Sequence, residues 1–128
     1  MRMDRERQAE GPVVRGFGAD GFKVDDAEGR TGMVAALLLT ATRADAWSPP
    51  PLAELSVGDL AAVLDPAPEF VLLGTGATLA HPPRALVAAL EARGIGVEAM
   101  DSRAAARAWG VLRAEGREIA AALYPLGA

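Results

Sequence analysis

The second half of the chain alternates short apolar runs with helical patterns, and this order constrains the fold more than any other feature. Strand patterns cover residues 70–73, 95–100 and 119–123, with helical patterns at about 83–93 and between Asp101 and Gly116. Strands separated by helices of this length are typical of βαβ units, in which the strands run parallel. We therefore predict an α/β domain with a C-terminal βαβαβ unit.

Crossover connections between parallel strands are right-handed. If the three strands pair consecutively, both helices of this unit cover the same face of the sheet. Gly94 and Gly116 are expected to end the two helices in left-handed conformations, and Asp101 or Ser102 to cap the start of the second helix. Gly110 lies inside that helix, where we expect close packing or a bend.

The first half is divided by turn residues at close intervals, which predicts short strands joined by hairpins that cover or extend the sheet. Met33–Leu39 is continuously apolar, which is typical of a central strand buried on both faces. Residues 47–51, Trp-Ser-Pro-Pro-Pro, predict a stiff extended connector. Ser56 is expected to cap a short helix. An uncovered sheet edge in this half could support a homodimer.

The chain has 128 residues, which predicts a flexible N-terminal arm at 1–10 and a single domain at 11–128. Its net charge is only −4 with basic residues scattered among acids, so we expect no nucleic-acid partner. There is no Cys and one His, His81, and no acidic spacing that suggests a metal site, so we expect no metal and no cofactor. No apolar run reaches the roughly 20 residues that span a bilayer. We therefore expect a cytoplasmic protein without a membrane partner.

The turn Gly74-Thr75-Gly76 follows a strand at the end where open α/β sheets bind ligands. A dinucleotide fingerprint would need a third glycine and an immediate helix, but Leu79 stands at the third position and prolines delay the helix. The favoured interpretation is a tight turn that requires two glycines. Nucleotide binding is the alternative.

Ser102, Arg103 and Arg107 could form an anion site at the start of the second helix. The alternative is helix capping with salt bridges to neighbouring acids, which we favour. Ser102 has no nearby base in sequence, and His81 belongs to a different loop, so no catalytic residue is assigned. Trp47 and Trp109 are expected to pack in the core or at its rim.

Several segments together carry a resemblance to a known family. They are Gly16-Phe17-Gly18, Gly21-Phe22, Trp47, residues 72–76 (LLGTG), residues 94–102 (GIGVEAMDS), Arg107 and residues 112–117 (LRAEGR). This set resembles the Mth938-like (DUF498) family over about residues 13–123. The resemblance implies a three-layer α/β fold with a mixed central sheet. Members of the family include uncharacterised bacterial proteins, an adipogenesis-associated protein and a mitochondrial complex I assembly factor.

The chain departs from the family pattern in its second helix. Positions where the family often has Cys, Tyr and Asn hold Ala106, Trp109 and Gly110 here. A role for that Cys as nucleophile or redox group is therefore impossible in this chain, and the resemblance brings no family-wide enzymatic activity.

We therefore expect an accessory or assembly-type module that binds a protein partner, and we do not expect an enzyme. The alternative is a small-molecule (anion) binding protein or enzyme with a pocket at Gly74-Thr75-Gly76 and candidate ligands Ser102, Arg103 and Arg107. An exposed apolar surface would favour the first hypothesis. A polar pocket in which Arg103 or Arg107 converges on Thr75 would favour the second.

Overall fold

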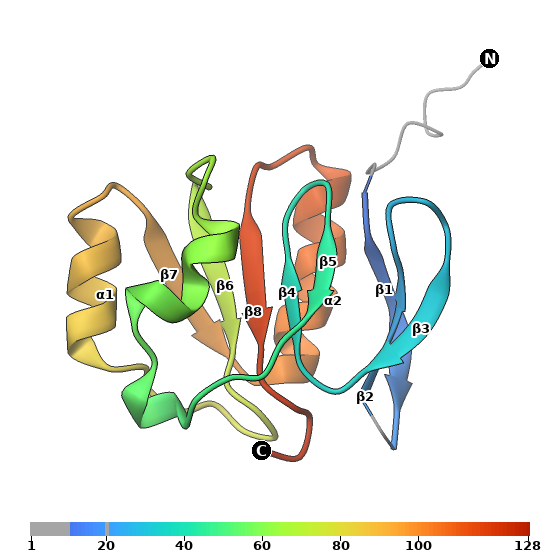
Figure 1. The fold of residues 1–128 in the computed structure, drawn as a ribbon, viewed down its shortest axis with the longest axis horizontal. Helices are drawn as coiled ribbons and strands as arrows, with labels where there is room; N and C mark the ends of the chain where they lie inside the picture. The colour runs from blue at the N-terminus through green and yellow to red at the C-terminus, as the bar shows by residue number, and fades with distance from the viewer. Residues whose placement is uncertain (1–10, 20) are drawn as a thin grey trace.

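The computed structural model describes residues 11–19 and 21–128, so the arm expected at residues 1–10 lies outside the described part. Within that part the chain forms a three-stranded sheet and a five-stranded sheet. Figure 1 shows the five-stranded sheet at the centre, with the three-stranded sheet at the N-terminal side of the molecule. Helices and the smaller sheet cover the central sheet on two faces, which gives the three-layer α/β architecture expected from the sequence.

The central sheet is mixed and has the strand order β5-β4-β8-β6-β7. Its C-terminal strands β6, β7 and β8 pair in parallel, whereas β4 pairs antiparallel with both β5 and β8. Their bounds are β4 Leu37–Leu39, β5 Ala44–Ala46, β6 Phe70–Gly74, β7 Gly96–Met100 and β8 Ala120–Leu123. The strands predicted in the second half are thus confirmed, and the hairpin β4–β5 extends the sheet from the first half.

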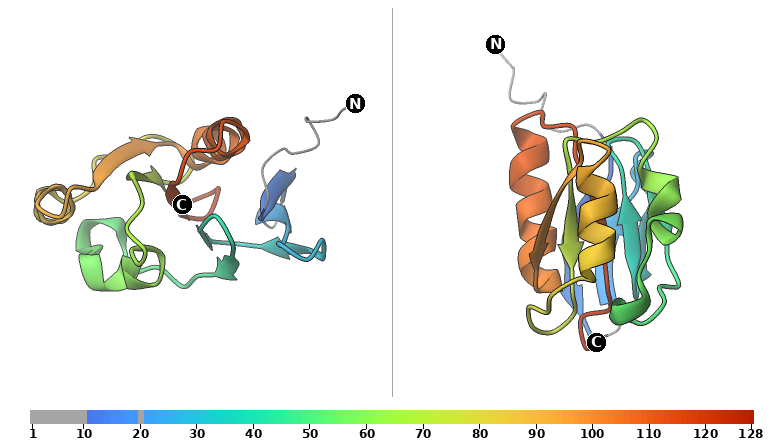
Figure 2. Two further views of the ribbon diagram at one scale, coloured as in Figure 1. Left: turned by 90° about the horizontal axis from the view of Figure 1, so that it is seen from above. Right: turned by 90° about the vertical axis from the view of Figure 1, so that its left-hand side faces the viewer.

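The two helices lie on opposite faces of the central sheet, because the consecutive strand pairing on which a shared face depended does not occur. Helix α1 (Arg84–Glu91) connects β6 to β7, and helix α2 (Ser102–Ala114) connects β7 to β8. Strand β8 pairs with β6 instead of β7, so the second connection runs back across the sheet. A right-handed crossover that reverses direction must pass over the other face. Figure 2 shows the two helices on either side of the sheet.

Each face of the central sheet has its own apolar core. One core joins α1 and the 3₁₀ helix η3 (Val57–Val63) to the sheet through side chains such as Leu60, Leu90 and Leu73. The other joins α2 and the three-stranded sheet through Trp109, Phe22 and Leu72. Strand residues alternate between the two cores because successive side chains point to opposite faces.

The three-stranded sheet is a meander of β1 (Val13–Gly18), β2 (Gly21–Asp25) and β3 (Thr31–Val34). Its order β1-β2-β3 leaves β1 and β3 at the edges. The single central strand predicted over Met33–Leu39 is wrong, because Ala35 and Ala36 form a bend and the chain leaves one sheet for the other. Of the strands in this run only β4 is buried throughout, while Met33 in β3 is 50% exposed.

Most of the predicted boundaries are confirmed. Gly94 and Gly116 follow the helices with φ of 79° each, and Asp101 caps α2 by accepting a hydrogen bond from the Ala104 N–H. Ser56 precedes η3 and its N–H bonds to the Asp59 carboxylate, although this helix is 3₁₀ instead of α. Gly110 is exposed, and a Cβ added to it would meet no neighbouring atom within 4 Å, so the expected close packing is wrong.

Candidate functional site

The carboxyl ends of β6 and β7 form the topological switch point of the sheet. Strand β6 continues toward α1 on one face, and the neighbouring strand β7 continues toward α2 on the other. In open α/β sheets the crevice at such a point is where ligands bind. The turn Gly74-Thr75-Gly76 follows β6, and Asp101-Ser102 follows β7, so four of the six candidate residues meet here.

Hydrogen bonds within the chain close this crevice. The Thr75 N–H donates to the Met100 carbonyl at 2.9 Å, and the Ser102 N–H donates to the Gly76 carbonyl at 2.8 Å. The Ser102 hydroxyl accepts from the Gly76 N–H at 2.9 Å and donates to the Tyr124 carbonyl at 2.8 Å. Ser102 is 0% exposed, so its hydroxyl is committed to the fold.

The Thr75 side chain also has partners within its own loop. Its Oγ1 donates to the Thr78 carbonyl at 2.7 Å and accepts from the Ala80 N–H at 3.0 Å. The next residue, Gly76, has a φ of 113° and lies against Ala128, whose carbonyl accepts from the Ala77 N–H. The tight turn that requires glycine is therefore present, and the C-terminal residues complete it.

Position 74 requires glycine because Ser102 and Leu123 occupy the space that a Cβ would need. A Cβ at this position would lie 2.8 Å from the Ser102 hydroxyl oxygen and 2.9 Å from both the Ser102 Cα and Leu123 Cδ2. Real Cβ atoms do not approach other atoms so closely, so a substitution must displace α2 or β8. Ligand binding at this turn stays a prediction, and it would require the hydrogen bonds above to open.

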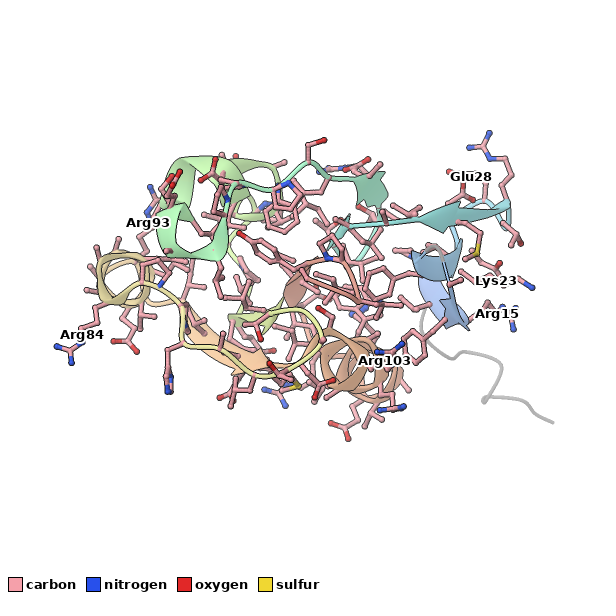
Figure 3. All side chains as sticks on the ribbon, turned by 90° about the horizontal axis from the view of Figure 1, so that it is seen from below. Arg15, Lys23, Glu28, Arg84, Arg93 and Arg103 are labelled. Carbon is pink, nitrogen blue, oxygen red and sulfur yellow. The ribbon has the colours of Figure 1, made fainter. Side chains whose placement is uncertain are left out.

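The two arginines of the candidate site point elsewhere. The Cζ atoms of Arg103 and Arg107 each lie 5.6 Å from the centre of the Phe17 ring, on the three-stranded sheet. Figure 3 shows Arg103 reaching from α2 toward that sheet. The arginines therefore contact the ring of Phe17 instead of converging on Thr75. Sequence spacing showed the arginine pair one turn apart, but no local signal in the sequence identified Phe17 as the residue beneath it.

No catalytic set forms around Ser102 among the residues described. His81 is an exposed loop residue at one end of a surface groove beside α1, with a volume of about 590 Å³, whereas Ser102 is buried under the switch-point turn. Groups of three or more His, Cys, Asp or Glu residues suited to a metal ion do not occur in residues 11–19 and 21–128. Over the same residues, no helix is both long and apolar enough to cross a bilayer.

The buried phenol of Tyr124 ties the C-terminal strand to the proline connector. Its hydroxyl donates to the Pro50 carbonyl at 2.7 Å, and its ring packs edge-on against Trp47. Burial, together with the nearby Asp59 charge, raises the pKa of Tyr124 to about 12. The phenol is therefore neutral at physiological pH and serves as a hydrogen-bond donor. The predicted core or rim position of Trp47 is confirmed.

A groove between the two sheets was missed by the sequence analysis. It has a volume of about 310 Å³ and is lined by Val24, Asp26, Arg30, Thr31, Gly32, Val34, Leu37 and Ala44. Its walls come from the inner face of the three-stranded sheet and from β4 and β5. The bend at Ala35–Ala36 creates it, because β3 and β4 diverge from that point (Figure 1). Because Met33–Leu39 is continuously apolar, its sequence indicated neither the bend nor the groove beside it.

Two open strand edges border this groove. In an antiparallel pair, residues bonded to the partner strand alternate with residues whose backbone groups face away. The Asp26 N–H bonds to the Arg30 carbonyl, so Thr31 and Met33 of β3 face away from β2. The Thr40 N–H bonds to the Arg43 carbonyl, so by the same rule Ala44 and Ala46 of β5 face away from β4.

Charged side chains fix one end of the groove. Asp26 accepts the Arg30 N–H at 2.9 Å and the Arg30 Nε at 3.0 Å, and these bonds lower the pKa of Asp26. The pKa of Asp25 is also lowered, first by the Thr31 hydroxyl and then by Arg15. The carboxylates therefore stay ionised and hold the β2–β3 turn in place.

A third cavity, of about 380 Å³, lies at the end of the central sheet opposite the switch point. Its lining comes from the β4–β5 turn, the segment after η3 and the start of β8, and comprises Thr40, Ala41, Thr42, Arg43, Val63, Asp65, Pro66, Ala67, Pro68, Glu118, Ile119 and Ala120. Arg43 is tied there to Asp45 and to the Ala62 carbonyl. None of the candidate residues from the sequence lies in this cavity.

Three similar proteins are described without naming an activity. A Rhodobacter capsulatus protein described as uncharacterized is 36% identical over 115 residues, which cover 88% of this chain and 84% of the relative. A solved Bordetella parapertussis protein is 30% identical with a TM-score of 0.77, over 91% of this chain and 97% of that one. A Bordetella pertussis protein described as a Mth938-like domain is 26% identical with a TM-score of 0.72, over 90% of this chain and 86% of that one. Residues 14–124 match the family described as protein of unknown function DUF498/DUF598, and the chain therefore belongs to this Mth938-like family.

Proposed function

We propose that this domain is an accessory module that binds an extended segment of a partner protein along the open edges of β3 and β5. The observation that carries the proposal is the groove of about 310 Å³, lined mainly by apolar residues and charged at one end, that both edges border. An extended peptide can add a strand to an open edge through backbone hydrogen bonds, while pockets beside the edge select its side chains. Thr31, Met33, Ala44 and Ala46 offer those backbone groups.

The closed switch point supports the same proposal. Doubly wound sheets place small ligands at this crevice, but here the chain fills it with its own hydrogen bonds. The assembly factor in the family supports an interaction role by analogy alone, since one fold can host unrelated functions. The proposal keeps the cytoplasmic location and the absence of catalysis expected from the sequence.

Selection from a displayed library of random nine-residue peptides tests this proposal. Peptides selected on the wild-type protein should bind the variant Gly32→Val at least tenfold more weakly. Gly32 lines the groove and has no atom within 4 Å of an added Cβ, so we expect the larger side chain of valine to occupy the groove. NMR titration should shift the amides of Thr31, Met33, Ala44 and Ala46 first.

The matched control is Val111→Glu, which changes a residue that is 60% exposed on α2, away from the groove. This variant should bind the selected peptides with wild-type affinity. If no peptide is selected, or if Gly32→Val binds them as well as the wild type does, the groove is not the interaction site.

A further inference from the structure

A pair of arginines on α2 converges on a single aromatic ring. Arg103 and Arg107 lie one helical turn apart, and both guanidinium groups lie over the ring of Phe17. Like charges four residues apart on a helix repel each other. The shared ring holds them together, because each cation is attracted to the face of an aromatic ring.

Most other arginines in the described residues are held in ion pairs, whereas this pair, like Arg84 and Arg93, is not. Five arginines each have a carboxylate oxygen within 4.0 Å, namely Arg15, Arg30, Arg43, Arg113 and Arg117. Within residues 11–19 and 21–128, no such ion pair involves Arg103 or Arg107. The two guanidinium groups that converge on one point are therefore also ones that lack an acidic partner in this part of the chain.

The position of Arg103 in the helix is electrostatically unfavourable, in addition to its repulsion from Arg107. It lies in the first turn of α2, which contains no acidic residue. A cation is disfavoured at this end of a helix because the exposed N–H groups give it a partial positive charge. The nearby Asp101 carboxylate offsets part of this cost while it caps the Ala104 N–H.

Phe17 gives the pair a fixed platform. Its ring contacts Phe22 edge-on at 6.2 Å, and Phe22 is 0% exposed in the core between α2 and the three-stranded sheet. A guanidinium that stacks on a ring uses its flat face, and its N–H donors lie in the plane of the group. The donors of both arginines therefore remain able to bind a further group.

We propose that Arg103 and Arg107, supported by Phe17, form a binding site for a doubly charged phosphate group. Two guanidinium forks can each donate parallel hydrogen bonds to phosphate oxygens, which is the geometry that arginine provides and lysine does not. A dianion between the two cations would also remove their mutual repulsion. Arg15 and Lys23 project outward from the three-stranded sheet in Figure 3, away from Arg103, so the site consists of the two arginines.

This site is separate from both surfaces described above. Gly74, Thr75, Gly76 and Ser102 take no part, because their polar groups bond within the chain. The groove between β3 and β5 is also not involved, so a failure of phosphate binding would leave the peptide proposal intact. The anion site that the sequence offered as an alternative is therefore proposed for the side of α2 instead of the switch-point turn.

NMR titration with inorganic phosphate, at pH 7.5 and at an ionic strength held constant with sodium chloride, tests the proposal. We expect a millimolar dissociation constant, with the largest changes at the Nε–Hε signals of Arg103 and Arg107. Arg103→Gln and Arg107→Gln should each weaken binding about tenfold, because each removes one charged hydrogen-bonding partner worth roughly 1.4 kcal/mol. A parallel titration with phenyl phosphate compares a phosphate ester with free phosphate. The ligand with the lower dissociation constant identifies which of the two the site prefers.

The charge-matched control is Arg84→Gln, which removes one exposed cation from the α1 side of the molecule (Figure 3), as each α2 variant removes one from the proposed site. It should bind phosphate as the wild type does. Phe17→Leu keeps both charges but removes the ring, and binding about threefold weaker is expected. Equal weakening in the control, or unchanged binding in both α2 variants, would show non-specific charge screening and overturn the proposal.

Discussion

The switch-point crevice and the groove between the sheets differ in how their backbone polar groups are bonded. Those at the crevice are hydrogen-bonded within the chain, whereas those along the groove are open. At the crevice, Gly76, Ser102 and Tyr124 exchange hydrogen bonds and no space remains for a Cβ on Gly74. Along the groove, the backbone groups of β3 and β5 face outward, and Gly32 has open space beside it. The family motif at the turn therefore maintains the fold, while the less regular half of the chain offers the open surface.

The difference has a physical origin in strand connectivity. Three parallel strands need crossovers, and the reversal between β7 and β8 brings the ends of β6 and β7 together under α2. Buried polar groups at such a point must find partners or be desolvated at a cost of about 1–3 kcal/mol each. The edge strands of the first half are different, because water can hydrogen-bond to their outward-facing backbone N–H and C=O groups.

The substitution Gly74→Ala tests the closed region and has the largest expected effect. The added methyl would overlap Ser102 and Leu123, and relief requires movement of α2 or β8. We expect a loss of about 3 kcal/mol in the free energy of unfolding, measured by urea denaturation, because overpacking in a rigid core has costs of this size. A variant as stable as the wild type would show that the crevice has room for more atoms. The conclusion that the crevice is closed and the groove open would then be wrong.

The substitution Gly32→Ala makes the same chemical change in the open region. Gly32 also lies in a strand, but an added methyl meets no atom within 4 Å. Alanine restricts the unfolded chain more than glycine does, so we expect a gain of about 0.5–1 kcal/mol in the same urea experiment. A destabilised variant would mean that the groove is narrower than its volume of about 310 Å³ indicates.

The C-terminal half of the fold was predictable because each of its strands and helices has a complete local signal. Gly94, Gly116 and Asp101 mark helix ends through backbone conformation and capping, which depend on few neighbours. The position of β8 between β4 and β6 was not predictable, because buried strands of Ala and Leu pair equally well with either neighbour. That one pairing decides which face α2 covers.

The candidate site was predictable only as far as chain proximity allowed. Gly74, Thr75, Gly76 and Ser102 follow adjacent strand ends and therefore meet. Arg103 and Arg107 follow directly, but a helix rotates successive side chains by about 100°, so these two face the three-stranded sheet. The partner Phe17 comes from a strand roughly 90 residues earlier in the chain, and no spacing rule connects it to α2.

Acidification tests whether the open region depends on its carboxylates, and it has the smallest expected effect. Asp25 and Asp26 have pKa values below the usual 3.8, through the Thr31 hydroxyl and Arg15 at Asp25 and through Arg30 at Asp26. Because the folded pKa values are lowered, their contribution to stability is present above about pH 4 and is lost as the pH falls through the folded values. We therefore expect the β2–β3 amides to lose hydrogen-exchange protection, relative to the β6 amides, as the pH falls below about 4. Asp26→Asn should reduce this relative loss, because one of the two titrating groups is gone. An equal loss in β6 and in β2–β3 would show that the three-stranded sheet unfolds only together with the central sheet.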